Sequence, residues 1–156
     1  PEPPDGYRIR CYDVDAVAPE QGRFGRMWRC TTLMVNWFYD APGPRPVDAM
    51  SPHHHDDFEQ LSLQLGGDYV HHIRTPWGKD MAEWREDDHV AVGSPSMVVI
   101  PPPTVHTTQS TGTDTYIHFD IFSPPRVDFS SQPGWVLNAA DDPAPEGVAP
   151  DGDAAR

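Results

Sequence analysis

Alternation of apolar and polar residues dominates the middle of the chain, and this pattern predicts β-strands. In residues 60–65 leucines alternate with polar side chains, which is the period of a strand with two different faces. Gly66, Gly67 and Asp68 follow directly and predict a tight turn. Residues 69–75 alternate again, so we expect them to return as the second strand of a hairpin.

Shorter strands are predicted on both sides of this hairpin, and no segment sustains a helical period. The 19 prolines and 12 glycines favour short strands over long helices. Residues 81–88 fit either a helical turn or a loop. The remaining predicted strands are a weak one at 7–13, two strands or one bent strand within 24–39, and short strands at 89–92, 97–100, 105–109 and 116–122.

Many short strands without a strong helix predict an all-β fold, namely a small antiparallel β-barrel or double-sheet jelly roll with extended N- and C-terminal arms. We expect residues 1–40 to supply strands that pack on the barrel or on a dimer partner, and residues 41–127 to form the barrel. Residues 128–156 lose the alternation and predict an extended, partly disordered tail. An upstream segment stays an open alternative, because the chain begins at Pro1 and not at a methionine.

Composition narrows the classes of partner. The formal net charge of −13 argues against nucleic acid and against an anionic membrane surface. No apolar run approaches the roughly 20 residues of a membrane span. Cys11 and Cys30 match no redox or zinc spacing, so we expect two free thiols in a cytoplasmic protein.

Three consecutive histidines, residues 53–55, precede the predicted hairpin and indicate a metal site. In an extended chain His53 and His55 share one face and His54 takes the other. Glu59 has the parity of His55 in a straight strand, whereas Gln60 reaches that face only if residues 56–58 bulge or turn. A further imidazole comes from His106. Such a ligand set suits one divalent transition metal, Zn, Fe, Ni or Mn; the alternative interpretation is a solvated histidine loop.

The motifs around these histidines resemble those of the cupin superfamily. The first cupin motif is matched either by His53-x-His55-x3-Glu59-x6-Gly66 or by the same histidines with Gln60 and Gly67. We favour Gln60, because Gly67 then occupies the glycine position of the turn that usually ends this motif, and residues 65–69 resemble its Leu-Glu-Gly-Glu-aromatic pattern. The second motif reads Pro101-x-Pro103-x2-His106, with Pro103 in place of its inner glycine. The resemblance covers about residues 45–127 and implies the barrel fold and the metal site.

The ending Asp120-Ile121-Phe122-Ser123-Pro124-Pro125-Arg126 resembles, more weakly, the small bacterial cupins that linearise unsaturated uronates from pectin and alginate. That resemblance implies His53, His55, Gln60 and His106 on the metal, with Asp120, Phe122 and Arg126 lining the site. Cupins of this size are often homodimers, and we expect the same here.

Several of these residues have a chemical role that their own side chains suggest. Asp120 is a candidate general acid and base, or else a partner that orients a metal-bound histidine. Arg126 could clamp a substrate carboxylate or form a surface ion pair. His118 shares the strand face of Asp120. Tyr69 and His71 share one face of their strand and His72 and Arg74 share the other; one of the two faces must line the cavity, and Tyr69 and His71 are our substrate-binding candidates.

We therefore expect a metal-dependent isomerase or lyase acting on a small, polar, carboxylated, sugar-derived substrate. The alternatives are an Fe(II)-dependent dioxygenase and a non-catalytic metal- or sugar-binding protein.

Overall fold

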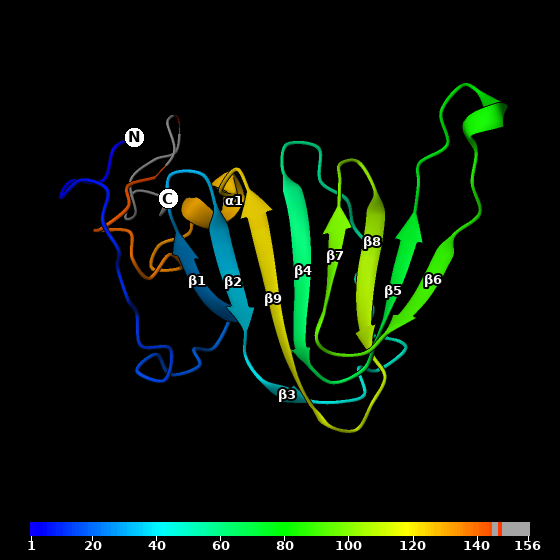
Figure 1. The fold of residues 1–156 in the computed structure, drawn as a ribbon, viewed down its shortest axis with the longest axis horizontal. Helices are drawn as coiled ribbons and strands as arrows, with labels where there is room; N and C mark the ends of the chain where they lie inside the picture. Colours follow the sequence, from blue (N-terminus) through cyan, green and yellow to red (C-terminus); the bar gives the residue numbers. More distant parts are fainter. Residues whose placement is uncertain (145–146, 148–156) are drawn as a thin grey trace. The chain divides into compact units, whose positions relative to one another are not determined.

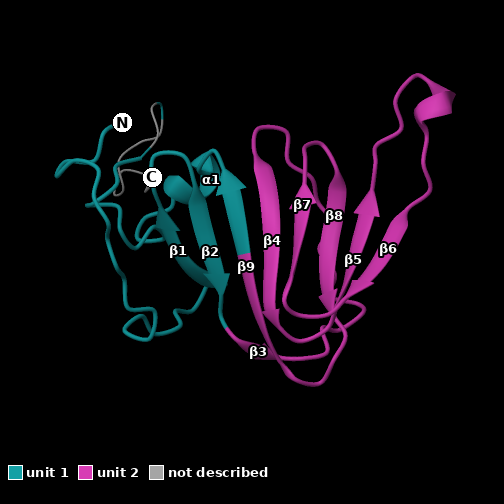
Figure 2. Ribbon diagram, viewed as in Figure 1, with its two compact units in different colours: residues 1–39, 120–156 teal, residues 40–119 magenta. Residues whose placement is uncertain are grey.

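The regular secondary structure of the chain is almost entirely β-strand, as described by a computed structural model for residues 1–144 and 147. It divides into two compact units, which Figure 2 distinguishes by colour. The first unit contains residues 1–39 and 120–156, and the second is the continuous segment 40–119. Strand β9 (Thr115–Ser123) begins in the second unit and ends in the first. The predicted all-β fold is confirmed, and its strands pair in antiparallel fashion.

The second unit contains two groups of paired strands that lie side by side in Figure 1. In one group β4 lies between β7 and β9, and in the other β5 lies between β6 and β8. A two-residue strand, β3, also pairs with β9. The bounds in this unit are β3 (Ala41–Pro42), β4 (Glu59–Gly66), β5 (Tyr69–Arg74), η1 (Met81–Glu83), β6 (Asp88–Val92), β7 (Ser96–Ile100) and β8 (Val105–Ser110).

The predicted hairpin of β4 and β5 is wrong, although both strands exist where expected. Each strand pairs with a distant segment instead, β4 with β7 and β5 with β6 and β8. The link between them carries the chain from one sheet to the other. Gly67 makes this possible because its φ of +92° lies in a region that L side chains rarely adopt. The alternation pattern identifies strands but not their partners.

The burial of the two faces of β4 is the reverse of that in an ordinary alternating strand, where the apolar face is buried and the polar face is exposed. Gln60, Ser62 and Gln64 are buried, whereas the leucines between them are partly exposed. The register with β7 sets Leu61 opposite Val99, and Leu63 opposite Met97. The inner face of this strand is therefore polar, which is what a barrel needs if it encloses a polar site.

The first unit contains β1 (Gly25–Arg29), β2 (Met34–Phe38), the end of β9 and a short helix α1 (Val127–Ser130). Residues 24–39 thus form two antiparallel strands, while residues 7–13 form no strand. Part of the predicted tail packs back on β1, since Val136 forms a bridge with Met27. The rest of that tail, residues 145–146 and 148–156, lies outside the described residues. The buried apolar side chains of this unit are Met27, Met34, Phe122, Phe129 and Val136.

Candidate metal centre

Three imidazoles converge in the second unit. The possible ligand atoms of His53, His55 and His106 all lie within 4.8 Å of one another. Two backbone hydrogen bonds set this geometry, because His53 and His106 each donate an N–H to the other's carbonyl, at 3.1 and 2.8 Å. Extended backbone sends alternate side chains to opposite sides. His54 accordingly lies apart from the cluster, and its side chain is exposed near Asp56.

The protonation of two of these rings is fixed by the backbone. Nδ1 of His53 lies 2.7 Å from the carbonyl oxygen of Ser51, and Nδ1 of His106 lies 3.0 Å from that of Thr104. A carbonyl oxygen can only accept a hydrogen bond, so Nδ1 must carry the proton in both rings. With the proton of a neutral ring on Nδ1, its Nε2 is the atom that can donate a lone pair to a metal ion. Such hydrogen bonds from the far ring nitrogen are the usual support of a metal-bound histidine.

Gln60 supplies a fourth donor atom from the first residues of β4. Its Oε1 lies 3.1 Å from Nε2 of His55 and 3.3 Å from Nε2 of His106, while its amide nitrogen donates to Ser62 Oγ. Oε1 is an acceptor, and so is Nε2 of a neutral His106 ring whose proton is on Nδ1, so a cation between the two atoms would satisfy both. The residues present therefore fit a metal ion, with three nitrogen donors and one oxygen donor.

The structure separates the two oxygen ligands that the sequence left as alternatives. Gln60 is buried beside the histidines, whereas Glu59 is exposed at the start of β4. Among the described residues Glu59 is not in the histidine cluster. The turn at residues 56–58 shifts the parity, as the Gln60 alternative required.

Two residues that contact the candidate ligands, Phe58 and Ser62, were not predicted from the sequence. Phe58 is buried with its ring centroid 4.1 Å from that of His55, so it restrains that imidazole. Ser62 accepts the Gln60 amide hydrogen bond and fixes which end of the amide faces the histidines. A signal for Ser62 was present, because it shares the parity of Gln60 and Gln64 in one strand. No pattern pointed to Phe58.

The predicted cavity residues of β5 do face the interior. His71 is buried, and its Nδ1 lies 3.0 Å from Thr108 Oγ1. The Tyr69 hydroxyl donates to the carbonyl of Gly66 at 2.7 Å, and burial raises the pKa of this phenol to about 12. The ring of His118 lies 6.0 Å from that of Tyr69. Tyr69 and His71 are thus buried on one face of β5, the His118 ring of β9 lies near that of Tyr69, and Tyr69 is neutral at physiological pH.

The other three candidates, Asp120, Phe122 and Arg126, belong to the first unit. Asp120 and Phe122 are buried there. The guanidinium of Arg126 lies over the Phe129 ring at 3.4 Å and binds both oxygens of Asp128. Burial alone would raise the pKa of Asp128, but the hydrogen bond and charge of Arg126 hold it below its usual value. Arg126 is therefore engaged in an ion pair, and the catalytic and substrate roles of these residues stay predictions.

Comparison with known proteins gives the fold. No protein-family model matches the chain, and no curated protein matches it. Among solved structures, KdgF from Halomonas sp. matches at a TM-score of 0.52 with 18% identity, over 75% of this chain and 96% of that one. A conserved protein with a double-stranded β-helix domain from Klebsiella pneumoniae matches at 0.50 with 16% identity, over 74% and 84%. The cupin domain of Schizosaccharomyces pombe Cnp3 matches at 0.51 with 10% identity, over 78% and 73%.

The chain therefore has the fold of the cupin superfamily, a double-stranded β-helix, and it carries a three-histidine cluster suited to a metal ion. At these identities the likeness shows the fold and not the reaction. Within the described residues, no helix is long and apolar enough to cross a membrane.

Proposed function

We propose that the chain is a metal-dependent cupin enzyme that catalyses isomerase- or lyase-type chemistry on a small, polar, carboxylated, sugar-derived substrate. The observation that carries this proposal is the convergence of the donor atoms of His53, His55 and His106 with Gln60 Oε1. A bound divalent ion, Zn, Fe, Ni or Mn, would supply a Lewis acid for a carbonyl or hemiacetal oxygen of the substrate.

The remaining chemistry falls to side chains of the chain itself. Asp120, with His118 on the same face of β9, is our candidate for moving a proton on the substrate. Arg126 is the candidate that binds the substrate carboxylate. To do so, its guanidinium must release Asp128, whose two carboxylate oxygens it binds in this structure. Tyr69, His71 and Phe122 are proposed to shape the substrate cavity. Tyr69 would do so through its ring, because its hydroxyl is already bonded to Gly66.

The class of substrate rests on the resemblance of residues 120–126 to the uronate-linearising cupins. The exposed free thiols of Cys11 and Cys30 fit the reducing cytoplasm, where we place the protein.

The first test is metal content by elemental analysis of protein purified without added metal. We expect one ion per chain, lost in His106→Ala and kept in His54→Ala, because His54 is a matched imidazole outside the cluster. Metal that survives His106→Ala, or that disappears equally in His54→Ala, would contradict the centre.

The second test separates the reaction classes. The metal-loaded protein should convert unsaturated uronates without consuming oxygen, and Asp120→Asn should abolish the conversion while the metal stays bound. Oxygen uptake by the iron-loaded protein would establish the dioxygenase alternative. Ligand binding that Asp120→Asn leaves intact, with no turnover of any substrate, would establish the non-catalytic one.

A further inference from the structure

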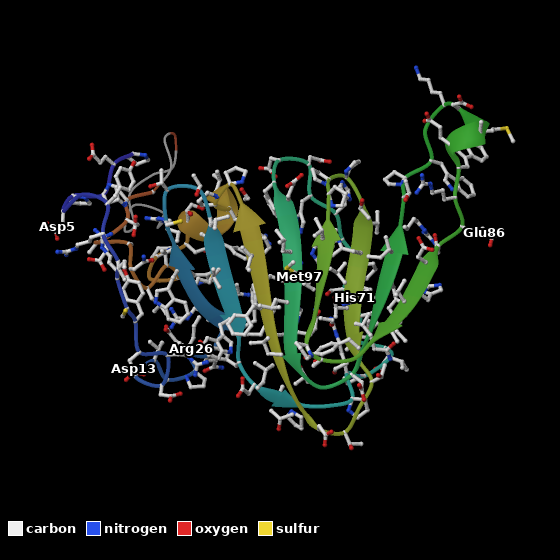
Figure 3. The ribbon with its side chains drawn as sticks, in the orientation of Figure 1. Asp5, Asp13, Arg26, His71, Glu86 and Met97 are labelled. Carbon is white, nitrogen blue, oxygen red and sulfur yellow. The ribbon has the colours of Figure 1, made fainter. Side chains whose placement is uncertain are left out.

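The loop between β5 and β6, residues 75–87, extends well past the ends of the neighbouring strands of the second unit, and it carries the short helix η1 near its far end (Figure 1). Along one side of this loop lies a cavity of about 670 Å³. Figure 3 labels one lining residue, Glu86, at the point where the loop approaches β6. A cavity of this size is within the range that holds a small ligand. It is lined by Arg74, Thr75, Trp77, Arg85, Glu86 and Asp87.

Two tryptophans give the loop a rigid aromatic surface. Trp77 and Trp84 stack with centroids 4.7 Å apart and an interplanar angle of 7°. Both indole N–H groups are bonded within the loop, Trp77 to the carbonyl of Arg85 at 3.2 Å and Trp84 to that of Gly78 at 2.9 Å. Even so, Trp77 remains 66% exposed. A large apolar ring held rigidly at the surface, with its polar atom already satisfied, is a typical binding feature.

The charges around Trp77 leave one cation available. Arg74 binds Asp87 through two hydrogen bonds of 2.9 and 2.6 Å, and this partner holds the pKa of Asp87 below its usual value. Arg85 has no ion pair within residues 1–144 and 147, although Glu86 follows it in the lining. The cavity thus combines an aromatic face with the guanidinium of Arg85, and the carboxylate of Glu86 belongs to the same lining. That pairing suits a ligand with an apolar ring face and a carboxylate.

The register of β5 and β8 separates this cavity from the metal centre. Ile73 lies opposite His106, and Arg74 lies opposite Val105. Successive side chains of a strand point to opposite faces, so Arg74, the first lining residue, lies on the face away from His106. Both features lie in the same unit.

We propose that the β5–β6 loop is a second binding site, which takes a carboxylated sugar ring. One face of the ring lies on Trp77, the carboxylate pairs with Arg85, and hydroxyl groups reach Glu86 and Thr75. The choice of a uronate rests on the proposed function, but binding at the loop does not require the metal.

The test measures binding to the full chain after chelation of all metal, so that the metal centre contributes nothing. The probes are a galacturonate dimer and its methyl ester, which differ in charge and hardly in shape. We expect wild-type protein to bind the acid about 10-fold more tightly than the ester, since a charged hydrogen bond is lost in the ester. Isothermal titration calorimetry gives both constants.

Three variants assign the contacts. Arg85→Gln should remove the preference for the acid while leaving ester binding unchanged. Trp77→Ala should weaken both probes about 5- to 10-fold, and Trp77→Phe should weaken them less. Lys79→Gln is the matched control, because it removes a cation of the same loop that does not line the cavity.

Equal binding of acid and ester by wild-type protein would overturn the proposal, as would identical effects of Arg85→Gln and Lys79→Gln. If Trp77→Ala leaves the binding of both probes unchanged but lowers the molecular mass of the protein in solution, a second copy of the chain occupies this surface, and the proposal is wrong. If chelated protein binds the acid as expected while the loaded protein turns over no uronate, the loop site stands and the proposed function fails.

Discussion

At the scale of single residues, the metal centre depends on the hydrogen bonds that hold each donor atom. The carbonyl two residues before His53 and the one two residues before His106 occupy Nδ1 of those rings. Ser62 Oγ likewise accepts a hydrogen bond from the amide nitrogen of Gln60 and so orients that amide. These contacts orient three of the four donors, His53, His106 and Gln60, before any ion binds, which reduces the cost of ordering the site when an ion binds.

We predict that Gln60→Leu lowers metal affinity by at least about 10- to 100-fold, because it removes an oxygen donor while keeping similar volume. Competition with a chromophoric chelator measures the change. Glu59→Gln is the control and should leave the affinity unaltered, since Glu59 is exposed. The opposite pattern, with loss in Glu59→Gln alone, would make Glu59 the ligand.

Sequence reasoning reached the histidines but not the choice between Glu59 and Gln60. His-x-His and the distant His106 stand out in the printed sequence. Which oxygen joins them depends on the turn at residues 56–58, where one residue of parity decides the face. The packing of Phe58 on His55 depends on the same turn, so it could not be predicted either.

At the scale of elements, the link between β4 and β5 is the most constrained turn around the site. Gly67 has a φ of +92°, and a Cβ placed there would lie 3.2 Å from Cβ of Tyr116. Both the backbone conformation and the crowding disfavour any side chain at this position. This turn aligns β4, which carries Gln60, with β5, which carries Tyr69 and His71.

We predict that Gly67→Ala lowers the free energy of unfolding by roughly 1–3 kcal/mol. Gly78→Ala is the matched control, with open space around its Cβ and no positive φ, and should change stability by less than about 0.5 kcal/mol. Urea denaturation followed by circular dichroism measures both. Equal destabilisation by the two variants would show that the turn is not specially constrained.

Strand existence was predictable from the sequence, and strand pairing was not. Residues 60–65 and 69–75 alternate and are joined by a glycine turn, which is the local signature of a hairpin. A jelly roll uses the same local signature to pass between sheets, and the pairing partners β7 and β8 lie about 30 residues further along. Only long-range packing distinguishes these two uses.

At the scale of the whole molecule, the outer face of β4 and β7 indicates a second copy of the chain. Leu65, Met97 and Val99 are about half exposed, at 49%, 55% and 58%, and Leu61 and Leu63 continue the same face. A chain with a net charge of −13 repels its own copy over most of its surface. A face built of uncharged apolar side chains is where two copies can meet, and we propose the homodimer interface there.

We predict that Met97→Glu converts this dimer to a monomer at micromolar concentration, because it places two like charges in an apolar interface. Light scattering over a concentration series measures the mass. Val47→Glu, at an exposed apolar position elsewhere in the second unit, should leave the dimer intact. A wild-type chain that is monomeric at every concentration would exclude the interface.

The division of the chain has a consequence for its synthesis on the ribosome. Residues 40–119, which hold all three histidines and Gln60, form one uninterrupted stretch, whereas the other unit needs both the early and the late residues. Translation runs from the N-terminus, and segments that are complete can fold before the rest emerges. It follows that the nascent polypeptide can bring His53, His55 and His106 together while the end of β9, the strand that pairs with β2, is still being made.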